Sequence, residues 1–188
     1  MKTSITGAKK GQVFTWDLAI SISIFLIVLA MLFYMWNTTT SKATETRDIY
    51  EMESIATEVT ELLIRTPGVP RDWENMNLTN ITAIGLANVE PRILSREKIF
   101  RFVTLNYSDI RPLLGTRQYN FYFNMVYLAN KTTVNISNGT MTALCKQGEP
   151  SGNPAFELTS RRTSILDDEI VIIYFTVWTN VTYARTVH

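Results

Sequence analysis

The chain has 188 residues, of which 46% are hydrophobic and 19% charged, and 18 basic against 17 acidic residues leave a net charge of +1. This length suits one domain with an appendage. The charge balance excludes a strongly basic nucleic-acid-binding protein and an acidic disordered tail. One cysteine excludes an intrachain disulfide framework and a cysteine-cluster metal site, and one histidine, His188, argues against histidine-based catalysis or metal binding.

Hydrophobic residues are concentrated between Leu18 and Trp36, where 17 of 19 residues are apolar. Nineteen helical residues span roughly 28 Å, which is close to the hydrocarbon thickness of a bilayer. Ser21 and Ser23 are compatible with insertion because their hydroxyls can bond to carbonyls one turn earlier. A buried core helix is the first alternative, but this run is hydrophobic on every face. A secretory signal peptide is the second, but no small-residue cleavage site follows the run. The sequence predicts a transmembrane helix over 18–36.

The charges that flank this segment indicate its orientation. Residues 1–16 contain three lysines and no acid, whereas bases and acids are mixed after the segment (Lys42, Glu45, Arg47, Asp48 and Glu51). The positive-inside rule therefore places the residues before the segment in the cytoplasm and the residues after it outside the cell.

The residues before the apolar run form the motif Lys9-Lys10-Gly11-Gln12, followed by Val-Phe-Thr-Trp-Asp. This motif resembles the class III signal peptide of type IV prepilins in its archaeal form. The resemblance implies that a prepilin peptidase cleaves between Gly11 and Gln12 and removes a leader of residues 1–11. Glycine suits such a cut because its backbone is unhindered, and the two lysines would hold the leader at the anionic cytoplasmic membrane face.

The same resemblance gives Asp17 a role in filament assembly. Asp17 would be mature residue 6, one place later than the acidic residue of the bacterial pattern. A carboxylate at the membrane costs a few kcal/mol unless it is paired, and the new α-amino group of Gln12 on a neighbouring subunit would be its partner. An N-terminal glutamine can cyclise, however, which would remove that charge. The alternative is that Asp17 lies among the lipid headgroups and favours the helix N-terminus.

Beyond the membrane segment, apolar residues recur at three- and four-residue spacing, which predicts an amphipathic helix over about 43–65. This stripe consists of Ile49, Met52, Ile55, Ala56, Val59, Leu62 and Leu63. The polar, β-branched stretch 37–41 is a weak helix former and is expected to be a soft joint. The run Thr66-Pro67-Gly68-Val69-Pro70 ends the helix, so one long helix over 12–66 is predicted, a layout similar to that of type IV pilins.

Residues 67–188 are expected to form a single head domain. Ser95 and Ser108 are predicted N-caps of two short helices, the second ending at Gly115. A strand is predicted over 119–128, with Tyr119, Phe121 and Phe123 on one face. Shorter strands are expected near Val134 and over 141–145, and a loop over 147–154.

A hairpin is predicted from strands over 157–166 and 169–183 that meet at Asp167-Asp168. Its second strand is apolar on both faces, so we expect it to be central and buried between the long helix and the rest of the head. The fold class is therefore α+β, pilin-like, with the long N-terminal helix packed on a mainly antiparallel sheet. Two head segments, residues 66–74 and 105–108, resemble uncharacterised archaeal proteins with class III signal peptides.

Eight Asn-x-Ser/Thr sequons occur, although chance predicts about 2.5 from the chain's 13 asparagines and 36 serines and threonines. This excess indicates N-linked glycosylation of an extracellular surface, against the alternative of incidental matches in a threonine-rich protein. Asn37, beside the bilayer, and Asn180, in a predicted strand, are the weakest candidates. The favoured sites are Asn130, Asn135 and Asn138, followed by Asn77, Asn80 and Asn106.

The sequence contains none of the enzyme motifs sought: a glycine-rich phosphate loop, a nucleophile elbow or a histidine-centred triad. The acids Asp167-Asp168-Glu169 are typical of a solvated turn rather than a cation site. The pair Arg161-Arg162 is too small for nucleic-acid binding, and Cys145 is typical of a small core residue. We expect no enzyme activity, no cofactor and no metal.

The expected function is that of a major or minor pilin, a structural subunit of an archaeal surface filament used for adhesion. The expected partners are further copies of the chain, the prepilin peptidase, the bilayer before assembly and N-linked glycans, but no nucleic acid. The head would be extracellular, first at the cell membrane and then on the filament. The alternatives are a single-span surface receptor or binding protein and a pseudopilin-like component of a secretion machine.

Overall fold

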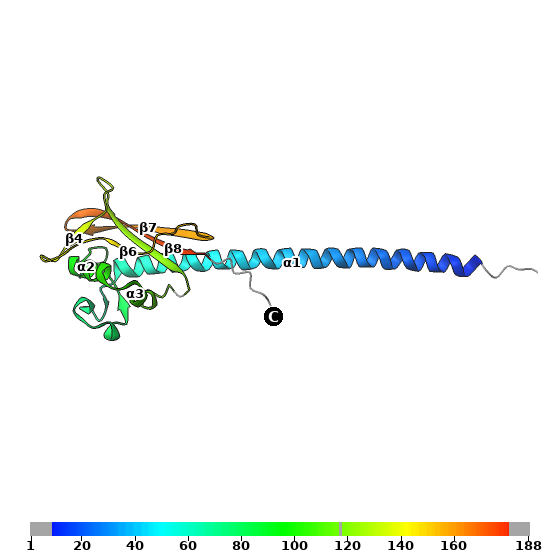
Figure 1. Ribbon diagram of the computed structural model, residues 1–188, viewed down its shortest axis with the longest axis horizontal. Coiled ribbons are helices and arrows are strands. Elements are labelled where there is room, and N and C mark those ends of the chain that lie inside the picture. Colours follow the sequence, from blue (N-terminus) through cyan, green and yellow to red (C-terminus); the bar gives the residue numbers. More distant parts are fainter. Residues whose placement is uncertain (1–8, 117, 181–188) are drawn as a thin grey trace, which may run out of the picture. The chain divides into compact units, whose positions relative to one another are not determined.

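A computed structural model describes residues 9–116 and 118–180 of the chain, and for residues 9–15, 40–46 and 48 it describes the backbone alone. The chain divides into two compact units, Met1–Thr46 and Arg47–His188. Helix α1, Lys9–Arg65, runs through both units (Figure 1).

The first unit consists, in its described part, of the beginning of α1. The stretch Trp16–Thr39 is long and apolar enough to cross a membrane, and its most apolar 18 residues have a mean hydropathy of 2.6. Every side chain in this stretch is exposed. The Ser23 hydroxyl donates to the carbonyl of Ala19 at 2.7 Å, as predicted from the sequence. Thr38 donates to the carbonyl of Tyr34 at 3.0 Å, and the predicted soft joint at 37–41 is helical backbone throughout.

The second unit begins with the last turns of α1, and the predicted apolar stripe supplies its core. Five of the seven stripe residues are buried, whereas Ile49 is exposed and Leu62 is half-buried. Thr60 and Ile64 are also fully buried, so the buried face is wider than the stripe predicted. The buried Thr60 hydroxyl is satisfied because it donates to the carbonyl of Ala56 at 2.5 Å.

Short elements follow α1 before the main sheet begins. They are strand β1 (Gly68–Val69), the 3₁₀ helices η1 (Trp73–Asn75) and η2 (Leu78–Asn80), strand β2 (Ala83–Ile84), and helices α2 (Arg96–Thr104) and α3 (Tyr107–Leu114). Ser95 caps α2 as predicted, since its side chain accepts from the backbone N–H of Lys98. The predicted cap Ser108 is wrong: Asn106, an equally favourable cap residue, precedes α3. Gly115 ends α3 in the left-handed conformation, as predicted.

A four-stranded antiparallel sheet in the order β6-β3-β8-β7 forms the main layer of the head. Its strands are β3 (Asn120–Tyr127), β6 (Lys146–Gly148), β7 (Phe156–Leu166) and β8 (Glu169–Thr179), and a separate hairpin pairs β4 (Asn135–Ser137) with β5 (Thr142–Leu144). The predicted loop over 147–154 is wrong at its start, because residues 146–148 pair with the edge of β3. Gly148 permits this pairing through its positive φ of 93°.

The inner face of the sheet packs on the helices. Phe121 and Phe123 of β3 and Phe175 of β8 are fully buried there. The rings of Phe121 and Phe175 stack at 5.3 Å, and Phe123 meets Phe102 of α2 edge-on at 5.1 Å. Figure 1 shows the last turns of α1 between this sheet and helices α2 and α3. The chain is therefore an α+β protein with a long N-terminal apolar helix and antiparallel sheets.

The β7–β8 hairpin turns at Asp167 and Asp168, as predicted, and both residues have positive φ, 51° and 64°. Such values at both central positions are those of a type I′ turn. Strand β8 is central in the sheet, as predicted, and its burial on both faces is largely confirmed, because on the outer face Ile172, Thr176 and Trp178 are also buried. The exceptions on the outer face are Ile170, which is 51% exposed, and Tyr174, which is half-buried.

The segment that follows α1 forms a tight corner around Trp73. This side chain is fully buried, and its indole N–H donates to the carbonyl of Gly85 at 2.9 Å. Strand β1 pairs with β2 beside it, and a β-carbon added at Gly85 would lie 2.1 Å from the carbonyl oxygen of Thr66. The corner therefore requires glycine at this position.

Lys98 ties helix α2 to the same corner. Its ammonium group donates to the carbonyls of Pro67 and Arg71, both at 2.6 Å, and the residue is only 4% exposed. Burial lowers the pKa of Lys98. Because two backbone carbonyls depend on one side chain, Lys98 acts as a structural clamp here.

Strand β7 is tied to α1 by an ion pair. The Arg162 guanidinium donates to the Glu61 carboxylate at 2.7 Å, and Arg65 contacts the other carboxylate oxygen at 2.7 Å. The hydrogen bond from Arg162 is the main reason why the pKa of Glu61 is lowered, with the charges of Arg65 and Arg162 adding to it.

The Gly85→Ala substitution should destabilise the head by about 1–3 kcal/mol, because the new β-carbon would overlap backbone atoms. Gly152→Ala is the matched control, since a β-carbon at Gly152 has no neighbour within 4 Å, and its effect should stay within about 0.5 kcal/mol. Urea unfolding of the full chain in detergent measures both. If both variants lost the same stability, close packing around Gly85 would not explain the effect.

Arg162→Gln should lower the free energy of unfolding by about 1 kcal/mol at pH 7, the value of a partly exposed charged hydrogen bond. Because the folded pKa of Glu61 lies below its ordinary 4.5, this stabilisation is complete above pH 4.5 and is lost as the pH falls through the folded pKa. The difference between wild type and variant should therefore be complete at pH 7 and should shrink as the pH is lowered below 4.5, which unfolding measured across this pH range tests. Arg161→Gln, an exposed neighbour, should show little difference at any of these pH values.

Candidate functional site

The proposed cleavage site lies at the beginning of α1. Lys9, Lys10, Gly11 and Gln12 have helical backbone, and their side chains lie outside the described residues. Residues 1–8 of the proposed leader also lie outside them. Cleavage between Gly11 and Gln12 therefore stays a prediction.

Asp17 is the only charged residue between 16 and 39, and its side chain is exposed. It is the second residue of the apolar stretch that begins at Trp16, so its carboxylate stands at one end of an otherwise apolar helix. A carboxylate in this place gains from a cationic partner or from water. The structure contains a single chain, so pairing with another subunit stays a prediction.

Small residues lie one helical turn apart in the same stretch. Ala19 and Ser23 are both exposed, and the bond from the Ser23 hydroxyl to the Ala19 carbonyl leaves that hydroxyl satisfied without a partner helix. Two small side chains at positions i and i+4 allow another helix to approach closely.

All eight sequon asparagines are exposed, so none is sterically withheld from modification. They comprise the six favoured sites (Asn77, Asn80, Asn106, Asn130, Asn135 and Asn138) together with Asn37 and Asn180. The expectation that Asn180 lies inside a strand is wrong, because β8 ends at Thr179 and leaves Asn180 exposed directly after it. Exposure makes glycosylation possible, and its occurrence stays a prediction.

Two favoured sequons adopt Asx turns. Asn130 Oδ1 accepts from the backbone N–H of Thr132 at 3.0 Å and from its hydroxyl at 2.8 Å. Asn138 Oδ1 accepts from the backbone N–H groups of Thr140 at 3.2 Å and Met141 at 3.1 Å. In both turns the side-chain oxygen is occupied, and the amide nitrogen, the atom that carries an N-linked glycan, makes no bond to any described residue.

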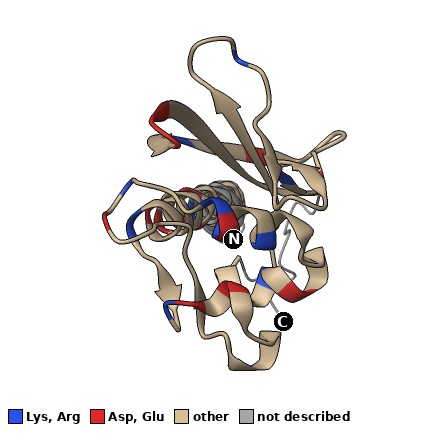
Figure 2. Cartoon of the chain, turned by 90° about the vertical axis from the view of Figure 1, so that its left-hand side faces the viewer, with Lys and Arg blue, Asp and Glu red and all other residues tan. Residues whose placement is uncertain are grey.

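The arginine pair on β7 is divided between two faces of the sheet. Arg162 points to α1 and binds Glu61, whereas Arg161 lies on the outer face with its guanidinium 5.9 Å from the ring centre of Tyr174. Asp167, in the acidic turn, forms an ion pair with Arg96. Figure 2 shows acidic and basic positions interleaved over the head.

Cys145 is fully buried, and burial raises the pKa of its thiol to about 12. This burial confirms the prediction of a small core residue. A thiol with so high a pKa is almost wholly protonated at neutral pH and is therefore a poor nucleophile.

Sequence reasoning missed the outer face of the sheet. Tyr122 and Asn124 on β3 alternate with the buried residues Phe121 and Phe123, so a period of two already assigned them to the opposite face. On the neighbouring strand, Tyr174 and Thr176 lie on this same face. The pattern gave their face but not their partners on adjacent strands.

Replacing Asn138 with Gln should reduce the intact mass of the native protein by one glycan, because Asn138 is exposed and its amide nitrogen bonds to none of the described residues. Asn153→Gln is the matched control: Asn153 is also exposed, but Pro154 follows it and no sequon is present. Mass spectrometry of protein from the native host measures both. An intact mass equal to that of the bare chain would contradict glycosylation at every sequon.

Comparison of the chain with known protein families, with curated proteins and with solved structures found no match.

Proposed function

We propose that the chain is a structural subunit of an archaeal type IV pilus-like surface filament, assembled through its N-terminal helix after cleavage by a prepilin peptidase. The observation that carries this proposal is the stretch Trp16–Thr39, an apolar helix with all its side chains exposed, which directly follows the leader-like motif at Gly11. The α+β head with a long N-terminal helix is compatible with a pilin-like layout.

The exposed helix supports assembly because its surface needs an apolar environment. Twenty-four residues at 1.5 Å each reach roughly 36 Å, enough to cross a bilayer. A bilayer satisfies this surface before assembly. Sister helices satisfy it in a filament, where close packing replaces lipid contacts. Ala19 and Ser23 allow such packing, because their small side chains let the backbone of a neighbouring helix approach closely.

Asp17 supports directed assembly rather than simple anchoring. A single-span anchor has no need of a carboxylate at the end of its apolar stretch, where an unpaired charge is unfavourable, although it costs less than the about 2.5–3.5 kcal/mol of a charge at the centre of a membrane helix. Pairing with the α-amino group of Gln12 on another subunit would offset this cost and fix the axial position of each helix. Cleavage after Gly11 creates that amine, so processing and assembly would be linked.

The proposal is tested by shearing cells and measuring the chain in the filament and membrane fractions. Wild type should appear in the sheared filaments as a chain that begins at Gln12. Gly11→Val should remain in the membrane at full length, because a β-branched side chain hinders the cut. Asp17→Asn should be processed normally but should be depleted at least tenfold from filaments.

Asp109→Asn is the control, because Asp109 is an exposed acid of the head and should leave both fractions unchanged. Retention of wild type in the membrane, with none in the sheared fraction, would contradict the filament and favour an anchored receptor. Normal processing of Gly11→Val would refute the cleavage site alone.

A further inference from the structure

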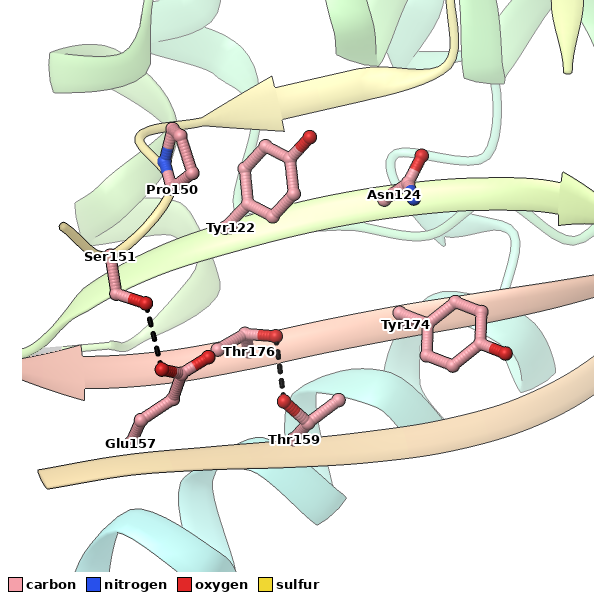
Figure 3. A pocket seen from close by; sticks show the side chains of 8 residues that line it. All are labelled: Tyr122, Asn124, Pro150, Ser151, Glu157, Thr159, Tyr174 and Thr176. Atoms are coloured by element: carbon pink, nitrogen blue, oxygen red, sulfur yellow. Dashed lines mark hydrogen bonds between the residues drawn. The ribbon is translucent and has the colours of Figure 1, made fainter. Parts of the chain in front are cut away.

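The outer face of the four-stranded sheet carries a shallow dish that the filament proposal does not use. Its volume is about 340 Å³, at the lower end of the range for ligand sites, about 300–1,000 Å³. Within the described part of the second unit, no helix covers this face (Figure 1). Its principal lining residues come from three adjacent strands and are Tyr122, Asn124, Glu157, Thr159, Tyr174 and Thr176 (Figure 3).

Strand register brings these side chains together. Thr176 of β8 lies directly opposite Tyr122 of β3 on one side and Thr159 of β7 on the other. Asn124 lies opposite Tyr174 in the next row of the same face. The two tyrosines are therefore diagonal neighbours on paired strands, and the backbone ladder fixes their spacing.

The tyrosines supply flat apolar surfaces at the edges of the dish (Figure 3). Both are half-buried, so their rings are restrained and still accessible. The Arg161 guanidinium lies 5.9 Å from the ring centre of Tyr174, within the range of a cation–π contact. This contact restrains the Tyr174 ring from the β7 side.

The floor of the dish is polar. The hydroxyls of Thr159 and Thr176 hydrogen-bond to each other at 2.8 Å, and Ser151 donates to the Glu157 carboxylate at 2.7 Å. Asn124 Oδ1 is buried and has no hydrogen-bond partner among the described residues. The dish thus combines closely spaced donors and acceptors with hydrogen-bonding capacity that the head itself does not use.

We propose that this dish binds a neutral carbohydrate. A sugar ring has an apolar C–H face, which matches a tyrosine ring, and a rim of hydroxyls, which matches the threonines, the Glu157 carboxylate and the Asn124 amide. The dish is too open to enclose a purely apolar ligand, and the Glu157 carboxylate repels anionic ligands. A proline-rich peptide would use the aromatic rings but not the polar floor. The proposal holds whether or not the chain assembles into filaments.

The test uses the full chain in a detergent without a sugar headgroup. Its binding is measured to immobilised neutral hexoses, N-acetylhexosamines, a uronic acid and a proline-rich peptide. Wild type should bind at least one neutral sugar more tightly than the uronic acid. Tyr122→Ala/Tyr174→Ala should weaken this binding at least tenfold, whereas Tyr50→Ala, an exposed tyrosine on α1, should not change it.

Two further variants keep the test valid if the double tyrosine variant fails to fold. Glu157 and Thr159 are exposed, so Glu157→Gln and Thr159→Val should fold normally. Each should weaken binding of the neutral sugar severalfold, and Glu157→Gln should also reduce the discrimination against the uronic acid. Glycans released from the native protein are then tested as competitors. If they compete, the bound sugar comes from a second copy of the chain; if they do not compete, it comes from another molecule.

Three results would overturn the proposal. The first is that no sugar binds wild type, and the second is that only the proline-rich peptide binds. The third is that sugar binding is unchanged in both Glu157→Gln and Thr159→Val, because binding would then occur elsewhere on the chain.

Discussion

The uncovered apolar surface of α1 between Trp16 and Thr39 is the constraint on which the rest of the structure depends. Nothing within the described chain buries these side chains, and water is a poor environment for a stretch of this length. The last turns of the same helix are buried instead: Met52, Ala56 and Leu63 lie almost fully buried in the head core. One continuous helix therefore needs two different surroundings, an apolar one supplied from outside and a core supplied by its own chain.

In the head, a single layer of helices packs against the sheet and buries the apolar face of the last turns of α1. Aromatic side chains from β3, β8 and α2 fill the inner face of the sheet. Trp73 and Lys98 hold the corner that follows α1 through bonds to backbone carbonyls. The outer face of the sheet is covered only in part, and Tyr122 and Tyr174 remain accessible there. This face carries the polar and aromatic dish, so the surface available for recognition is a consequence of the layer architecture.

Local patterns predicted the elements well and their partners poorly. The Ser95 cap, the Gly115 stop and the turn at Asp167-Asp168 were correct because each depends on residues close together in the chain. The errors arose where a distant segment decides the outcome. Residues 146–148 become a strand because β3 offers an unpaired edge.

The sequence by itself determined the apolar helix, its leader-like motif, the sequons and the α+β class, since composition, spacing and period are properties of the chain before it folds. The two-residue turn at Asp167-Asp168 also sets the register of β7 against β8, so the pairing of Thr159 with Thr176 follows from a local pattern. Only the tertiary structure decided which distant segments meet. Tyr122 lies 54 positions from Thr176 and faces it only because β3 and β8 pack side by side in the core. Glu61 and Arg162 likewise meet only because β7 packs on α1, and no local pattern encodes such packing.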